Sequence, residues 1–422
     1  MIIGWRKPSS PVHLLHASLL CCVVLLSACA TRPPVPAPTP APRPTPVPPS
    51  SPVPIPTPPI PTSPAIPSPQ AALPGLKSVP WSALPNWQAT RLSESWNAFL
   101  QGCTALQKKE GWRSVCADAR NLGNPNETAA RAFFERNFQA YESSNEDGST
   151  EGLITGYYEP MIQGSRMQTA RSRFPIFGVP DDLITVELAS VYPQLKSLRL
   201  RGKLSANKVV PYATRSEIER LNHDKGLKAR TLAWAEDAVE LFFMQIQGSG
   251  RVAFSDGTYL RLGYADQNGH PYKSIGKLLV ERGELTLDQA SMQSIKEWGN
   301  KNPDKLPALL ASNPSYVFFR ELPDGLSGPL GALGVPVTAG RSLAVDPTFI
   351  PLGAPVYLTT TLPNSTTPLN RLMMAQDTGG AIRGGVRGDF FWGFGTEAGE
   401  MAGKMKQPGR MWVLLPRDYP IN

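Results

Sequence analysis

Two aspartates separated by a glycine-rich stretch are the residues best suited to chemistry. Asp377 follows the apolar run 372–375, Asp389 comes twelve positions later, and five of the residues between them are glycines. Glycine suits tight turns and backbone that lies close to a ligand. The aromatic run 390–392 follows Asp389; such surface desolvates a carboxylate, raises its pKa toward that of a general acid, and suits a sugar substrate. The alternative is an aspartate that only bonds the backbone of its own turn.

Other arrangements of catalytic or cofactor-binding residues are missing from the sequence. It contains no Ser-His-Asp order or GxSxG, no phosphate-binding or dinucleotide-binding glycine loop, and its four histidines lack metal-ligand spacing. We therefore expect neither a cofactor nor a metal. The net charge of +8 favours anionic partners, but no compact Lys/Arg cluster with interleaved aromatics occurs, so we expect no nucleic acid partner.

The N-terminus has the composition of a secretion signal. Arg6 and Lys7 precede an apolar stretch, 17–26, that is too short to span a bilayer as a helix, and Leu26-Ser27-Ala28-Cys29 ends it. These four residues resemble the lipobox of bacterial lipoproteins, which implies a signal peptide over 1–28 and acylation of Cys29. Ala30, which is not aspartate, then implies the periplasmic face of the outer membrane. The alternative is an ordinary signal peptide with an incidental cysteine.

A proline tract separates this signal from the rest of the chain. Residues 31–70 include 19 prolines and almost no charge, so they cannot bury a core. We expect residues 29–75 to form a lipidated, disordered tether, and the folded part to begin near residue 76. Beyond this tract, Cys103 and Cys116 are the only cysteines. In an oxidising compartment we expect a disulfide between them, with free thiols as the alternative.

Apolar spacing predicts two helices and then a β-rich chain. The first helix covers Leu92–Leu106, and the second starts at a capping box formed by Asn124 and Glu127 and runs to Tyr141. Further helices are expected near 215–221, 274–281 and 289–298. Short strands are expected elsewhere, among them 153–159, 242–247, 316–319, 335–338, 343–345, 356–358, 372–375 and 411–415, with turns at 248–250 and 256–257. From Gly334 onward the chain looks entirely β, and such scattered strands favour barrels.

Several motifs taken together resemble a known family. Ala344–Gly353, Ala375–Ile382 and Gly388–Phe390 are similar to the "3D" module, which is named for three aspartates. Gly156–Pro160, Gln245–Gly250 and Tyr272–Gly276 extend the likeness, in the same order, to the membrane-bound lytic murein transglycosylase A family. One departure is the loop between Asp377 and Asp389, which is about a residue longer and, through Arg383 and Arg387, more basic.

The resemblance implies a mainly β fold with a helical N-terminal segment. A double-psi β-barrel domain would combine residues 76–172 and 323–422, with the 3D module at about 335–415, and a second β-barrel domain, 173–322, would be inserted in it. The groove between them would bind a glycan strand.

The reaction implied is non-hydrolytic cleavage of the β-1,4 bond between N-acetylmuramic acid and N-acetylglucosamine in peptidoglycan, exolytic, and forming 1,6-anhydromuramic acid ends. Asp389 would be the single acid and base, with Asp377 and Asp346 supporting it. The other residues implied at the substrate are Tyr157, Tyr158, Gln245, Gln247, Ser249, Gly379, Gly380 and Trp392. Expected partners are peptidoglycan, the outer membrane and proteins of cell-wall synthesis. The alternatives are a hydrolytic glycosidase that uses Asp377 and Asp389 as a pair, and a non-catalytic peptidoglycan-binding lipoprotein.

Overall fold

The computed structural model describes residues 73–195, 198–287 and 289–420. The predicted signal peptide, Cys29 and the proline tract therefore lie outside the described residues. Within these ranges, none of the helices combines the length and the hydrophobicity that a membrane-spanning helix needs.

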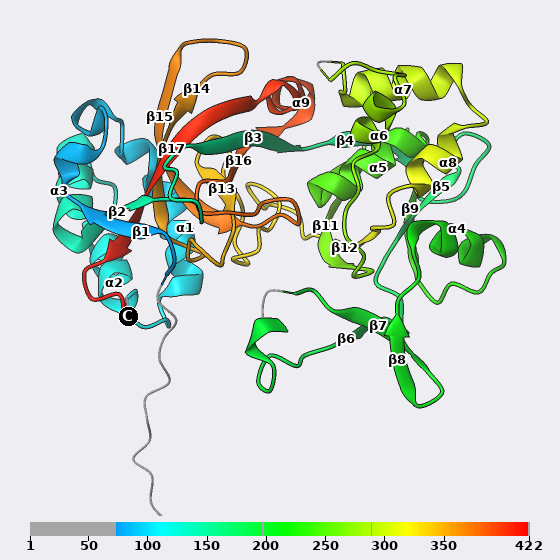
Figure 1. Ribbon diagram of the computed structural model, residues 1–422, viewed down its shortest axis with the longest axis horizontal. Coiled ribbons are helices and arrows are strands. Elements are labelled where there is room, and N and C mark those ends of the chain that lie inside the picture. Colours follow the sequence, from blue (N-terminus) through cyan, green and yellow to red (C-terminus); the bar gives the residue numbers. More distant parts are fainter. Residues whose placement is uncertain (1–72, 196–197, 288, 421–422) are drawn as a thin grey trace, which may run out of the picture. The chain divides into compact units, whose positions relative to one another are not determined.

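After a first short strand, the chain is helical as far as residue 137 (Figure 1). The helices are α1 (Trp96–Leu106), α2 (Arg113–Leu122) and α3 (Glu127–Asn137). α1 and α3 pack through a buried cluster of aromatic rings, which the first residue of the following strand completes: Trp96, Phe99, Phe133, Phe134 and Phe138. A disulfide joins Cys103 of α1 to Cys116 of α2. Both cysteines are buried in the same core, so the bond fixes two helices that already share apolar surface.

Six strands form a closed ring, and two more extend it. The ring order is β17 (Lys406–Pro416), β14 (Pro355–Thr361), β15 (Pro368–Asp377), β13 (Ser342–Val345), β16 (Gly388–Phe394) and β3 (Gly152–Glu159), and β3 pairs again with β17. The β13–β15 and β16–β3 pairs are parallel. β2 (Phe138–Ser143) and β1 (Leu76–Val79) continue from β17.

Two strands of this ring, β15 and β17, each contain a stretch that is buried on both faces. Residues 372–376 of β15 and 411–416 of β17 are buried without interruption, because the ring interior covers one face and neighbouring elements cover the other. On the outside, the hydroxyl of Ser95, just before α1, donates to the carbonyl of Leu372 at 2.7 Å. α9 (Gly395–Lys404) follows β16 directly and lies against β3 and β16.

The part of the chain between β3 and β13 forms a second sheet. Its order is β12 (Val317–Glu321), β11 (Tyr259–Gln267), β10 (Ser249–Ala253), β4 (Met161–Ser165), β9 (Thr231–Ala235) and β5 (Phe174–Phe177). Because β4 pairs with β10, the chain enters this sheet directly after Glu159, ahead of the boundary expected at residue 173.

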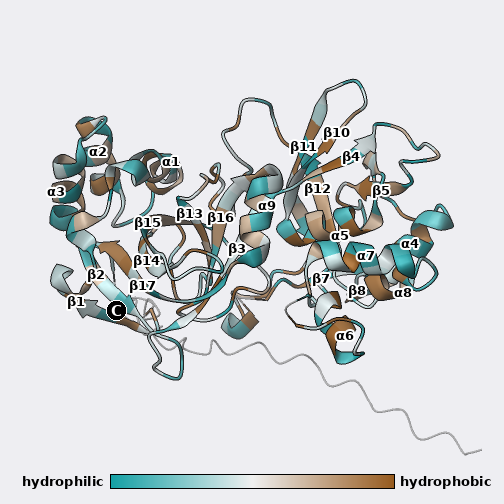
Figure 2. Ribbon diagram, turned by 90° about the horizontal axis from the view of Figure 1, so that it is seen from above, coloured by the Kyte–Doolittle hydropathy of each residue, from teal (hydrophilic) through white to brown (hydrophobic). Residues whose placement is uncertain are grey.

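Helices and a small sheet accompany the second sheet. The helices are α4 (Arg215–His223), α5 (Ala238–Gln247), α6 (Ile275–Glu281), α7 (Met292–Lys301) and α8 (Leu306–Ala311), and the small sheet consists of β6 (Ile184–Thr185), β7 (Arg201–Ser205) and β8 (Lys208–Pro211). α4, which is rich in charged residues, is largely teal in Figure 2. Its N-terminus has a capping box formed by Thr214 and Glu217.

Five local expectations from the sequence are wrong. Residues 242–247 belong to α5 and not to a strand: Asp237 caps the start of the helix, and Gly248, with φ 76°, ends it, so 248–250 is not a hairpin turn. Short apolar runs such as this one do not separate strand from helix by period alone. Residues 335–338 make only an isolated bridge at Pro336.

The other two corrections concern helix ends and a missed helix. The cap of α3 is Asn126, whose side chain accepts from the amide of Ala129, and the helix ends at Asn137, because Phe138 begins β2. The region after Gly334 is not entirely β, since it contains α9. Glycines lower the helix propensity of α9, but a Cβ at Gly399 would come within 2.8 Å of the Tyr158 ring, so packing requires a residue without one there.

Candidate active site

Asp389 lies where two strands of the ring flank β16. It pairs with Thr155 of β3 on one side and with Ala344 of β13 on the other. The Thr155 hydroxyl donates to Asp389 Oδ1 at 2.7 Å. Among the described residues, no hydrogen-bond donor is recorded for Oδ2. One oxygen is therefore fixed and the other is available to a substrate.

Burial raises the pKa of the half-buried Asp389 to about 6, against the Thr155 hydrogen bond and the charge of Arg387, which both lower it. The negative charge of Asp377 also raises this pKa. A carboxyl group with a pKa near 6 holds its proton in a large share of molecules at mildly acidic pH, which a general acid requires.

Asp377 ends β15, and its two oxygens are occupied. Oδ1 accepts from the amides of Ala332, at 3.0 Å, and Thr378, at 2.9 Å, and Oδ2 accepts from the Tyr157 hydroxyl at 3.1 Å. Burial raises the pKa of Asp377, against these hydrogen bonds and the charge of Arg199. These contacts hold the carboxylate in one orientation.

Tyr157 donates to Asp377 and lies close enough to Asp389 to sense its charge. Burial, together with the charges of Asp377 and Asp389, raises the pKa of Tyr157 well above its usual value, so the hydroxyl stays protonated and donates. Its ring packs on Phe391 with 5.0 Å between centroids. Thr155 and Tyr157 are two positions apart on β3, and so are Asp389 and Phe391 on β16. Residues with this spacing share a face of a strand, so all four side chains lie on one face of the parallel pair.

Asp346 supports the glycine-rich loop, and its hydrogen bonds to the described residues go to the backbone and not to Tyr157 or Thr155, which bind the other two aspartates. This buried side chain follows β13; its Oδ1 accepts from the amide of Thr348, and its Oδ2 accepts from the amide of Gly384 at 3.0 Å. Gly384 has φ 114°, a conformation that favours glycine, so residue type and side-chain contact together define the loop.

Four of the remaining predicted residues lie in the loop after Asp377 or make contacts with β3 and β16. Gly379 and Gly380 lie in the loop after Asp377, and Gly380 is exposed. Gln247 accepts from the amide of Tyr158 at 3.0 Å, which links α5 to β3. Trp392 packs on Phe390, with 4.7 Å between centroids, and its indole NH donates to Met405 Sδ.

Gln245 and Ser249 are both buried, at the end of α5 and the start of β10. Neither has a recorded contact with Asp389 in the described part of the chain. Their contact with substrate stays a prediction, as does that of Trp392.

Sequence reasoning missed Thr155 and Arg199. Thr155 lies two positions before Tyr157, so strand alternation places it on the same face, but its contact with Asp389 depends on the register of β3 against β16. Arg199 comes from the segment before β7, and its guanidinium donates to the Thr378 hydroxyl at 3.3 Å. No local pattern around Arg199 indicates this contact.

Comparison with known proteins identifies the family. The family model described as "MltA specific insert domain" matches residues 153–320, and the family model described as "3D domain" matches residues 341–415. Membrane-bound lytic murein transglycosylase A of Escherichia coli strain K12 is 32% identical over 310 residues, which are 72% of this chain and 73% of that protein. The chain belongs to the membrane-bound lytic murein transglycosylase A family.

Solved structures of this family share its fold. The crystal structure of MltA from Neisseria gonorrhoeae has a TM-score of 0.70 and 43% sequence identity, over 81% of this chain and 92% of that chain. The structure of E. coli MltA with bound chitohexaose has a TM-score of 0.55 and 29% identity, over 76% of this chain and 90% of that chain. The fold class, mainly β with some helices, is therefore that of the family.

Proposed function

We propose that this protein is a peptidoglycan lytic transglycosylase in which Asp389 is the single acid and base. Family membership supports the activity, and the environment of Asp389 supports the assignment of the residue. The observation that carries it is the difference between the two carboxylates: within the described ranges, Asp377 has hydrogen-bond donors on both oxygens, whereas Asp389 has one on Oδ1 only. An acid that transfers a proton needs an oxygen that faces the substrate.

The reaction follows from one carboxyl group and an internal nucleophile. Protonated Asp389 gives its proton to the glycosidic oxygen as the bond to C1 of N-acetylmuramic acid breaks. The 6-hydroxyl of the same sugar then bonds to C1 and returns its proton to Asp389, which closes a 1,6-anhydro ring. No water is consumed, and the enzyme regains its starting proton. Because the nucleophile is part of the substrate, a second carboxylate is not needed to activate water.

In this scheme Asp377 and Asp346 do not exchange protons with the substrate but hold other parts of the site in place. Asp377 fixes Tyr157 and the backbone at Thr378, and its charge raises the pKa of Asp389. Asp346 fixes the loop at Gly384. The occupied oxygens of Asp377 disfavour the hydrolytic alternative, in which this carboxylate would have to attack C1 or activate a water molecule.

The finer fold assignment is part of the same proposal. A closed ring of six strands with two parallel pairs supports a double-psi β-barrel made from both ends of the described chain. We place the start of the inserted domain at Pro160, since β4 already pairs with β10. The glycan strand would lie between this domain and the ring, with exolytic cleavage at Asp389.

The cellular setting rests on the sequence. Acylation of Cys29 would attach the chain to the periplasmic face of the outer membrane, and the proline tract would let the enzyme reach peptidoglycan and the proteins that synthesise it. Digestion of purified peptidoglycan, followed by mass analysis of the muropeptides, tests the activity. Products one water lighter than hydrolysis products support a transglycosylase, and hydrated products or no cleavage contradict it.

A further inference from the structure

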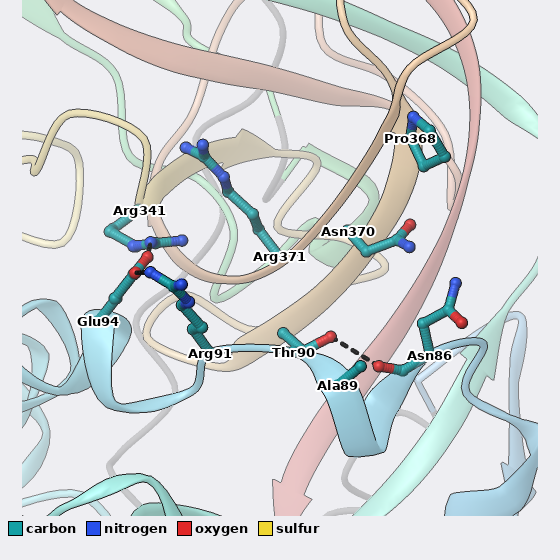
Figure 3. A pocket seen from close by; sticks show the side chains of 9 residues that line it. All are labelled: Asn86, Ala89, Thr90, Arg91, Glu94, Arg341, Pro368, Asn370 and Arg371. Carbon is teal, nitrogen blue, oxygen red and sulfur yellow. Dashed lines mark hydrogen bonds and ion pairs between the residues drawn. The ribbon is translucent and has the colours of Figure 1, made fainter.

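A polar cavity of about 370 Å³ has neither Asp377 nor Asp389 in its lining (Figure 3). Its lining comes from the segment 86–94, which precedes α1, from Arg341 just before β13, and from the first residues of β15. Figure 3 shows the side chains of Arg341 and Glu94 directed toward each other, with Arg91 beside them and Arg371 above.

The cavity lies on the other face of β16 from the candidate active site. The guanidinium of Arg371 is 5.7 Å from the centroid of the Phe390 ring. Phe390 and Asp389 are successive strand residues, so their side chains leave opposite faces of the sheet. A molecule in this cavity would therefore not occupy the position of the sugar that reacts at Asp389.

The charges around the cavity do not balance. Three arginines face one carboxylate, that of Glu94, a formal excess of two positive charges. Glu94 pairs with Arg341, whose side chain is only 12% exposed, and with Arg91 at 3.4 Å. Arg371 is half-buried, and no ion pair is recorded for it among the described residues; its hydrogen bond goes to the carbonyl of Gly340 at 3.4 Å.

The unfavourable part of this imbalance is the repulsion between Arg341 and Arg371, which are both half-buried, whereas solvent screens Arg91, whose side chain is 81% exposed. Burial lowers the pKa of Arg341, as does the neighbouring charge of Arg371, while Glu94 opposes both effects. Burial also lowers the pKa of Arg371. An oxyanion between the guanidinium groups would relieve the repulsion and accept paired N–H donors, the geometry for which arginine is best suited.

We propose that this cavity binds carboxylate groups of a short anionic peptide, the chemistry that the stem peptides of peptidoglycan present. The idea that such a peptide is the natural ligand rests on the proposed function. A peptide on a neighbouring strand would hold the enzyme on its substrate while Asp389 cleaves another strand.

The remaining lining favours a peptide over the phosphate headgroup of a lipid. The carboxamides of Asn86 and Asn370 line the cavity and can each donate to, and accept from, a peptide amide. A lipid headgroup site needs apolar surface beside it for acyl chains. None of the large exposed apolar side chains of the described region lines this cavity.

The test is titration calorimetry of the mature protein with a synthetic stem tripeptide that carries no sugar. We expect binding of the free-carboxylate peptide and not of the same peptide with its carboxylates amidated. Arg371→Gln should weaken binding at least about tenfold, because a charge-assisted pair is lost. Arg230→Gln is the matched control, since it removes an exposed arginine paired with Glu321 elsewhere and should leave the affinity unchanged.

Glu94→Gln should change the affinity for the peptide in the opposite direction from Arg371→Gln. It removes the one carboxylate that neutralises the cavity, so the peptide should bind several-fold more tightly, which a folding defect would not produce. Equal binding of the amidated peptide, no binding of either peptide, or tighter binding of glycerol phosphate than of the peptide would overturn the assignment. The measurement involves no cleavage, so a failure of the proposed lytic activity would appear separately.

Discussion

Asp389 and Asp377 differ most in what their oxygens contact. Thr155 holds one oxygen of Asp389, whereas three donors hold Asp377. The same chemical group can therefore move a proton at one position and fix a loop at the other. This division depends on hydrogen-bond donors from β3 and from the backbone, not on the aspartates themselves.

The pH dependence of turnover should show the raised pKa of Asp389. The protonated form starts the reaction, so kcat/KM should be highest below about pH 6 and fall as the pH rises through that value. Arg387→Gln removes a positive charge that favours the carboxylate, and should move the falling limb to higher pH. Asp377→Asn removes a negative charge and should move it to lower pH. Shifts of the same sign in both variants would contradict this electrostatic account.

The free energy of unfolding should respond to the same carboxyl group. Its pKa in the folded chain, about 6, is higher than the usual value of 3.8, so folding favours the protonated form. The stabilisation this gives is complete below about pH 4 and is lost as the pH rises through about 6. Asp389→Asn, which has no charge to bury, should be more stable than the wild type by about 1–3 kcal/mol at pH 7.

Denaturant unfolding at pH 7 and pH 4 checks this prediction. The advantage of Asp389→Asn should shrink at pH 4, where the wild-type carboxyl is also neutral. An equal difference at both pH values would mean that ionisation of Asp389 does not affect stability.

At the scale of the elements, we expect the disulfide between α1 and α2 to stabilise the folded protein. It closes a loop with a sequence separation of 13, which corresponds to about 3 kcal/mol on the loop-entropy model. Cys103→Ser/Cys116→Ser should lower the free energy of unfolding by roughly that amount. Alkylation of the native, unreduced wild type should label neither Cys103 nor Cys116, and labelling of both would show that they are free thiols.

The sequence indicates strongly periodic elements well and short apolar runs poorly. The aromatic spacing in α1 and α3 predicts the buried cluster that the structure contains. The run 242–247 resembles a strand because its apolar residues are contiguous, and only the caps at Asp237 and Gly248 settle it as a helix. α9 is harder still, because a glycine that it needs for packing on Tyr158 lowers its helix propensity.

The sequence also indicates some residues of the candidate site and not others. Asp377 and Asp389 are visible in the sequence because glycines and aromatics surround them. Thr155, Tyr157 and Arg199 reach them from distant segments. Such contacts follow from strand register and tertiary packing, which residue types along the chain do not determine.

At the scale of the whole molecule, we expect the N-terminus to determine where the enzyme works. Cys29→Ala should abolish metabolic labelling with palmitate and release the protein from the outer-membrane fraction, because the chain would lose its acyl anchor. Ser27→Thr, which leaves the cysteine in place, is the control. Continued labelling of Cys29→Ala, or fractionation of the wild type with the cytoplasm, would contradict the lipoprotein assignment.

The most direct test of the central claim is the rate at which Asp389→Asn releases 1,6-anhydro muropeptides from purified peptidoglycan. Asparagine keeps the shape of the side chain and can accept from Thr155, but it cannot deliver a proton. We expect a folded protein that still binds glycan strands and whose turnover is lower by on the order of 10²–10⁴-fold. A folded Asp389→Asn enzyme that releases anhydro products near the wild-type rate would contradict the role of Asp389 and point to Asp377 instead.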